Sequence, residues 1–202
     1  MKKAIIILTG IILSGIAFEG CKKGEGDPGI SFKSRKSRMT GEWKLTAGEV
    51  TNTNVSGSNT TTTHVIYDGS NAVSTLTVNG SSSSPSTNGY TLSWTIEKDG
   101  SYKKVEVTGT TNATTTTTTG TWNFLNGVGD LKNKEAVEFF VATVVSVTGS
   151  TSTSSTYTGS DMPHDTYLLN KLKSKEVIFK SAYTHADSNS SDSRDESWTL
   201  TQ

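Results

Sequence analysis

Apolar and polar side chains alternate with a period of two through most of the chain after residue 41, and this pattern limits the possible folds. In the segment 90–97 (YTLSWTIE), every second residue is apolar. Successive side chains of a β-strand point to opposite sides, so the alternation is typical of a strand with one buried face. No segment after residue 41 sustains the 3.6-residue period of an amphipathic helix. The pattern therefore predicts an all-β protein.

Turn residues separate the expected strands. Segment 90–97 is followed by Asp99-Gly100, which predicts a two-residue hairpin turn with Gly100 at positive φ. The run 136–147 (AVEFFVATVVSV) is apolar on both faces for much of its length, and its β-branched and aromatic residues favour a long strand over a helix. The remaining strands are expected at 43–47, 105–108, 121–124, 168–172, 177–183 and 196–202.

Short connections make sequential antiparallel pairing the simplest topology. About eight to ten such strands can close as an up-and-down β-barrel or pack as a β-sandwich. The strand pattern continues to the last residues of the chain, where a final strand can pair with the first, so a barrel is favoured. Residues 41–202 are long enough to form one domain with its own core.

The N-terminus has the features of an export signal that ends at a cysteine. Two lysines precede an apolar segment over 4–18, which is too short to span a bilayer as a permanent anchor. Gly20 and Cys21 match a bacterial lipobox, although Glu19 departs from the usual small residue. We predict a signal peptide over 1–20 and attachment of lipid, such as palmitate, to Cys21. Cys21 is the only cysteine, so an intrachain disulfide is excluded.

Residues 21–40 are rich in glycine and charge and have few apolar side chains, so we expect a flexible linker. Its cationic residues can be solvated or attracted to anionic lipid head groups. A nucleic-acid partner is not expected for an exported chain of zero formal net charge. The cationic residues are Lys33, Arg35, Lys36 and Arg38.

The opening Gly41-Glu42-Trp43 resembles the start of the first strand in lipocalins and their fatty-acid-binding relatives. Together with Cys21 and the basic run, it resembles small lipocalin-like lipoproteins of Bacteroidetes. The resemblance implies a barrel held at the outer membrane by its lipid, on the periplasmic face or the cell surface. It also implies that Gly41 and Trp43 close one end of the barrel, with a basic side chain over the indole. Arg194 is the only arginine after Arg38 and is the expected partner.

No arrangement of residues predicts an enzyme, a metal site or a cofactor. His64, His164 and His185 lack the neighbours of known metal motifs, and His164 with Asp161 and Asp165 is better interpreted as a polar loop. The acidic stretch 187–196 begins like a calcium loop but has Asp192 where glycine belongs and Trp198 where the bidentate glutamate belongs. It is therefore expected to be a solvated loop, and the Ser/Thr tracts between strands are expected to be loop ends or edge strands.

Two functions remain open. The barrel can bind a small apolar ligand between interior aromatic side chains, or it can be a non-enzymatic subunit that docks on an envelope or surface protein. A cavity of several hundred Å³ would support the first function, and a filled barrel with an exposed apolar patch would support the second. Plain core packing is the alternative role for each aromatic residue. The aromatic residues are Trp94, Trp122, Phe139 and Tyr183.

Overall fold

In the residues that the structure describes, antiparallel strands, one short α-helix and one 3₁₀ turn make up the regular structure. The computed structural model describes residues 27–28, 33–127 and 135–202. Within these ranges, no helix is long and apolar enough to cross a membrane. The elements are α2 (Arg35–Met39), β1 (Gly41–Ser56), β2 (Asn59–Tyr67), β3 (Asn71–Val78), β4 (Ser81–Ser82), β5 (Ser86–Ile96), β6 (Ser101–Thr108), β7 (Thr114–Phe124), β8 (Ala136–Thr148), β9 (Thr151–Thr156), the 3₁₀ turn η2 (Gly159–Asp161), β10 (His164–Leu172), β11 (Glu176–Ala186) and β12 (Ser190–Thr201).

Ten of these strands form a closed up-and-down barrel. The sheet runs β10-β11-β12-β1-β2-β3-β5-β6-β7-β8, and antiparallel pairing of β8 with β10 closes it. β4 and β9 are additional outer strands that pair with β3 and β8. The first and last strands pair along most of their length, as expected, with Leu45 opposite Leu200. The barrel prediction is therefore confirmed, and the alternative of a β-sandwich is wrong.

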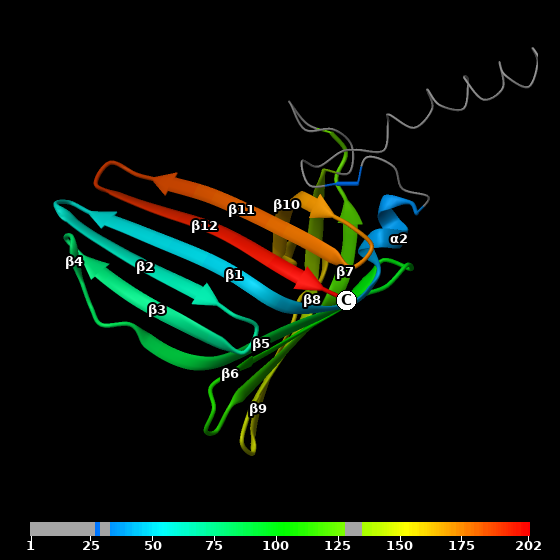
Figure 1. The fold of residues 1–202 in the computed structure, drawn as a ribbon, viewed down its shortest axis with the longest axis horizontal. Helices are drawn as coiled ribbons and strands as arrows, with labels where there is room; N and C mark the ends of the chain where they lie inside the picture. Colours follow the sequence, from blue (N-terminus) through cyan, green and yellow to red (C-terminus); the bar gives the residue numbers. More distant parts are fainter. Residues whose placement is uncertain (1–26, 29–32, 128–134) are drawn as a thin grey trace, which may run out of the picture.

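The barrel is narrow at one end and divides into two walls at the other. At the narrow, closed end, residues Gly41–Lys44 of β1 pair directly with β5. Further along, the β2–β3 hairpin inserts between β1 and β5. The outer halves of β11, β12, β1, β2 and β3 form one wall, and those of β6, β7, β8 and β9 form the other (Figure 1). The open end lies between these two walls.

The hydrophobic core lies at the closed end. Trp43 is fully buried there, and its indole Nε1 donates a hydrogen bond to the Met39 carbonyl oxygen over 2.8 Å. Burying a large apolar side chain stabilises a fold by about 1.5–3 kcal/mol, so this layer supplies much of the stability. The other fully buried side chains of this layer are Met39, Ile96, Val137, Leu172, Val177 and Leu200.

Arg194 does not lie over Trp43, so this prediction is wrong. The register places Arg194 of β12 opposite Asn52 of β1, whereas Lys44, next to Trp43, is opposite Thr201. Asn52 lies nine residues beyond Trp43 on β1. Strand residues rise about 3.3 Å each, so Arg194 lies about 30 Å from Trp43 along the wall. The guanidinium instead pairs with Glu196 across 2.7 Å.

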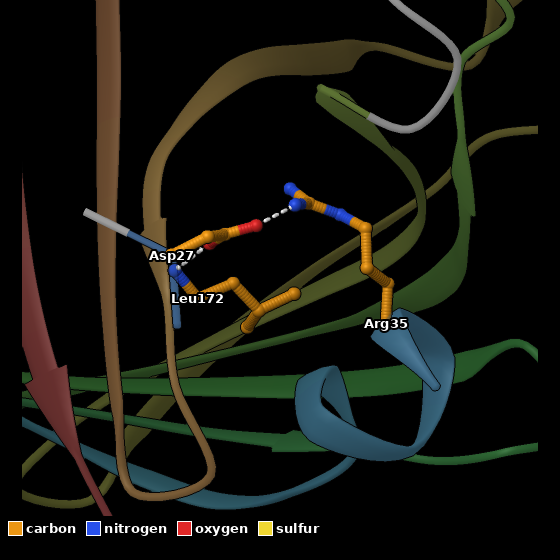
Figure 2. Close-up of polar contacts among 3 residues, drawn as sticks. All are labelled: Asp27, Arg35 and Leu172. Carbon is orange, nitrogen blue, oxygen red and sulfur yellow. Dashed lines mark hydrogen bonds and ion pairs between the residues drawn. The ribbon is translucent and has the colours of Figure 1, made fainter. Parts of the chain in front are cut away.

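The segment before β1 is docked on the closed end. Ser34 caps α2 by accepting a hydrogen bond from the Ser37 amide over 3.1 Å. Arg35 forms a buried ion pair with Asp27, whose other carboxylate oxygen accepts from the Leu172 amide over 2.7 Å (Figure 2). Asp27 thereby links the N-terminal segment to the end of β10.

The described part of this segment differs from the flexible, solvated linker expected from composition. Arg35 and Arg38 are 7% and 2% exposed, so the expectation of solvation is wrong for these two residues. Burial in a low-dielectric site lowers the pKa of the Arg35 guanidinium, and the negative charge of Asp27 opposes this effect. A composition poor in apolar residues did not indicate burial, because the buried groups here are the Asp27–Arg35 ion pair and the long side-chain stems of Arg35 and Arg38.

Two turns also differ from expectation. Gly100 has φ +99°, as predicted, but the Glu97 amide bonds to the Ser101 carbonyl oxygen over 2.9 Å, so the loop has three residues instead of two. A three-residue loop commonly ends with glycine at positive φ. The acidic stretch after Asp187, expected to be a loop, is a tight turn followed by the first half of β12.

Candidate functional site

A cavity of about 870 Å³ lies between the two walls, on the open-end side of the buried core. Its size is within the range of small-molecule sites in proteins, about 300–1,000 Å³. The cavity lies in the barrel interior and reaches the surface between β10 and β11. Its lining residues are Tyr67, Tyr90, Leu92, Trp94, Lys104, Glu106, His164, Asp165, Thr166, Tyr167, Leu168, Lys180, Ser181, Ala182, Tyr183, Arg194, Glu196, Trp198 and Leu200.

Aromatic rings form the floor of the cavity. Trp94 of β5 contacts the edge of Phe139, with ring centroids 4.5 Å apart, and stacks on Phe179 at 5.5 Å. Tyr167 of β10 lies beside the same cluster, 5.4 Å from Phe179. Aromatic pairs at these separations contribute about 0.5–1.5 kcal/mol beyond simple burial, so the floor is a rigid apolar surface.

Three further rings form the wall on the β1 side. Tyr67 lies 4.6 Å from Tyr90 and 4.9 Å from Trp198, measured between ring centroids. Gly48 of β1 lies opposite both Trp198 and Tyr67 in the sheet. A Cβ atom at Gly48 would lie 2.8 Å from the Trp198 ring, so glycine gives this indole its place in the wall.

The hydroxyls of Tyr90 and Tyr167 in the cavity are neutral at physiological pH. Burial raises the pKa of Tyr90, and the negative charge of Glu106 adds to the effect. Burial also raises the pKa of Tyr167, with a contribution from Glu196. A neutral hydroxyl can both donate and accept a hydrogen bond, so the walls offer polar contacts without a fixed charge.

Charged side chains surround the upper part of the cavity. Arg194 donates to Glu196 from Nε over 3.0 Å and from Nη2 over 2.7 Å. Burial alone lowers the pKa of Arg194, but the hydrogen bond and charge of Glu196 outweigh it and raise the pKa. Lys104 Nζ lies 5.7 Å from the centre of the Trp94 ring, within the range of a cation–π contact. The cavity therefore changes from aromatic at its floor to ionic at its rim.

Two of the four aromatic residues predicted to bind a ligand line this cavity. Trp94 is in the floor, and Tyr183, which is 57% exposed, is at the rim. Phe139 is 1% exposed and packs behind Trp94. Trp122 is in the core of the closed end, where its Nε1 donates to the Glu97 carbonyl oxygen over 2.9 Å. Cys21 lies outside the described residues.

Alternation alone does not identify the charged residues of the site. Lys104 and Glu106 line the cavity, so Val105 and Val107 between them face outward. An apolar-in, polar-out rule predicts the reverse. The neighbouring strand shows which residues of β6 face inward. Trp94 is opposite Lys104 and Leu92 is opposite Glu106, and residues opposite each other in a sheet share a face.

Metal-ligating side chains do not gather in this site. In the parts of the chain that the structure describes, no group of three or more His, Cys, Asp or Glu residues is placed to hold a metal ion. His164 Nε2 lies 3.8 Å from the Glu138 carboxylate. The centre of the His164 ring lies 5.8 Å from the centre of the Phe140 ring.

The fold and site define a closed, ten-stranded antiparallel β-barrel with an aromatic-floored cavity at its open end. No family model, curated protein or solved structure matches this chain. The functional argument therefore depends on the geometry of the cavity.

Proposed function

We propose that the barrel binds a small amphipathic ligand in the cavity between its two walls. The observation that carries this proposal is a space of about 870 Å³ with aromatic rings at the floor and paired charges at the rim. Core side chains fill the closed end, and the cavity lies outside this filled layer. The role we propose is binding, without catalysis.

The polarity of the lining favours a ligand with two chemically different ends. Trp94 and Tyr167 offer flat apolar surfaces to a ring or a short hydrocarbon group. Lys104, Glu106 and Arg194 line the same cavity and can pair with a polar head group. A purely apolar ligand, as the aromatic residues alone suggested, would take Lys104 and Glu106 out of water without offering them a polar partner.

A fluorescent amphiphile tests this proposal. We expect 8-anilinonaphthalene-1-sulfonate to bind the full chain at one saturable site, with a rise in its fluorescence and quenching of tryptophan emission. Ser181 lines the cavity, and the indole of Ser181→Trp should occupy part of it and weaken probe binding at least tenfold. Thr184→Trp is the matched control, because Thr184 is exposed and is not among the lining residues. Equal probe binding by wild type and Ser181→Trp would contradict the proposal.

We also propose that lipid on Cys21 holds the protein at the outer membrane. The apolar segment 4–18 followed by Gly20-Cys21 supports this. The anchor and the cavity are separate features of the chain, because Cys21 precedes the docked segment that begins at Asp27.

A further inference from the structure

Strands β10 and β11 are neighbours that pair along only part of their length. Their ladder runs from Leu172–Val177 to Leu168–Lys180 and stops there. Both strands continue: β10 extends back to His164 along β8, and β11 extends to Ala186 along β12. The same register would bring His164–Tyr167 opposite Ser181–Thr184, but the strands diverge. We call the gap between these two four-residue segments the wedge.

Backbone hydrogen-bonding groups on the β11 side point into the wedge. The Asp187 amide donates to the Ser190 carbonyl oxygen, so these two residues are a hydrogen-bonded pair of the β11–β12 ladder. Hydrogen-bonded and non-hydrogen-bonded pairs alternate in an antiparallel ladder. Odd-numbered residues of β11 therefore bond to β12, and the N–H and C=O groups of Ala182 and Thr184 face the wedge.

The β10 side has the complementary arrangement. The Val141 amide donates to the Pro163 carbonyl oxygen, and the Leu169 amide donates to the Glu135 carbonyl oxygen. Odd-numbered residues of β10 therefore bond to β8. The backbone groups of His164 and Thr166 then face the wedge. In the described part of the chain, no ladder partner faces the backbone of either edge. Such an edge is a template for another strand.

Side-chain pockets lie on both sides of the wedge. The main cavity is on the inner side, and a second groove of about 370 Å³ is on the outer side. Leu168, Lys180 and Ala182 line both. A strand placed in the wedge would direct alternate side chains into the cavity and into the outer groove, because successive side chains point to opposite faces.

We propose that the wedge captures an extended polypeptide segment, which adds as a strand to the free edge of β11. Backbone hydrogen bonds supply the affinity in this mode of recognition, and pockets for alternate side chains supply the specificity. The partner is thus a peptide with apolar side chains at every second position, suited to the Leu168 and Tyr183 surfaces that are 44% and 57% exposed at the wedge.

The free edge of β9 shows that an open edge alone is not sufficient. β9 consists only of serine and threonine, and all six residues are exposed. Polar side chains on an edge strand discourage pairing with other chains. β11 differs because its edge has a side-chain pocket on each face, which gives an added strand somewhere to place its apolar residues.

Hydrogen–deuterium exchange of the full chain with a synthetic peptide tests this proposal. The probe is a synthetic peptide of alternating valine and threonine, because it offers strand backbone groups and apolar side chains at every second position. We expect amides of Ala182 and Thr184 to exchange quickly in the free protein and to become protected with peptide. A scrambled peptide should give no protection. Slow exchange at these amides without peptide would mean that the wedge is closed in solution, and would overturn the proposal.

A backbone variant separates strand addition from side-chain contact. Ala182→Pro removes an N–H that faces the wedge, and edge strands tolerate proline at such positions. We expect it to weaken peptide binding at least tenfold in fluorescence anisotropy, whereas Ala182→Ser should bind like wild type. A urea melt checks that both variants fold. Equal peptide affinity for Ala182→Pro and Ala182→Ser would overturn the proposal, as would dimerisation of the free protein that buries this edge.

This inference does not rest on the proposed small ligand, since it concerns backbone groups at the edge of the cavity. Ser181 and Ala182 line both the cavity and the outer groove, so each variant is tested with both probes. Ala182→Pro should lose peptide binding and keep binding of the fluorescent amphiphile. Failure of one proposal is therefore distinguishable from failure of the other.

Discussion

Trp43 illustrates how a single residue can be predicted in position and missed in its contacts. The resemblance of the Gly41-Glu42-Trp43 opening led us to expect it at the closed end, and its side chain has no exposed surface. The partner of its indole is the Met39 carbonyl oxygen, supplied by α2. No periodic pattern predicts a five-residue helix, because so short a helix forms only through its tertiary contacts.

Substitutions at Trp43 should separate ring burial from the hydrogen bond. Trp43→Ala removes a buried aromatic ring and should lower the free energy of unfolding by about 3–5 kcal/mol. Trp43→Phe keeps a ring but leaves the Met39 carbonyl oxygen without its donor, so the loss should be smaller, about 1–3 kcal/mol. Urea melts of the two variants measure both values. A loss below about 1 kcal/mol for Trp43→Ala would show that the closed end does not depend on this residue.

Among the cavity residues, sequence reasoning named only Trp94 and Tyr183 as candidates for ligand binding. Trp94 was predicted because it stands in phase with its apolar neighbours on β5. Lys104 and Arg194 were not, because a charged residue facing inward contradicts the rule on which the prediction rested. The charge is tolerated here because these side chains border a cavity and have partners or an aromatic face beside them.

At the scale of elements, three hairpin turns are held by the same device. Asp68 accepts from the Ser70 and Asn71 amides, Asp99 from the Ser101 amide, and Asp187 from the Asn189 and Ser190 amides, all between 2.7 and 2.9 Å. Backbone hydrogen bonds to the ionised carboxylate lower the pKa of all three groups.

These turns make stability sensitive to acid. A carboxylate whose pKa is lowered on folding contributes stability above its unfolded pKa, about 3.9, and loses it as pH falls through the folded value. We expect the urea midpoint of the wild type to fall steadily below about pH 4. Asn keeps an oxygen acceptor but does not titrate, so the triple variant Asp68→Asn/Asp99→Asn/Asp187→Asn should show a shallower fall. Parallel curves for the two proteins would refute this account.

Most strands were predictable because each follows a local pattern, whereas their partners depend on distant parts of the chain. The run 136–147 was predicted as one strand and corresponds to β8. Its exchange of partners, from β10 to β9, comes from the placement of two later segments that no local pattern encodes. The same holds for β1, which pairs with β5 and then with β2.

For the whole molecule, closure of the barrel followed from a strand at each end of the domain. The division of the open end into two walls did not, because it arises where pairs of strands stop short of their full length. Leu168 and Lys180 mark one such point. Register fixes which residues face each other. The length over which two strands remain paired also depends on how each strand pairs with its other neighbour.

The anchor proposal makes a prediction at this scale. We expect mass spectrometry of membrane-extracted protein to show a chain that begins at Cys21 and carries acyl mass. Cys21→Ser should release the protein into the soluble fraction with an unchanged free energy of unfolding, because the barrel begins at Gly41. An unmodified soluble form as the main wild-type species would contradict the proposal.

The ion pair between Asp27 and Arg35 also determines which way an anchored barrel would point. Only five residues lie between Cys21 and Asp27, and an extended chain over this interval reaches about 20 Å. Asp27 is held against the closed end, so a lipid on Cys21 would keep that end facing the bilayer. The cavity and the wedge would then face the aqueous compartment, and their ligands would arrive by diffusion through water and not from within the membrane.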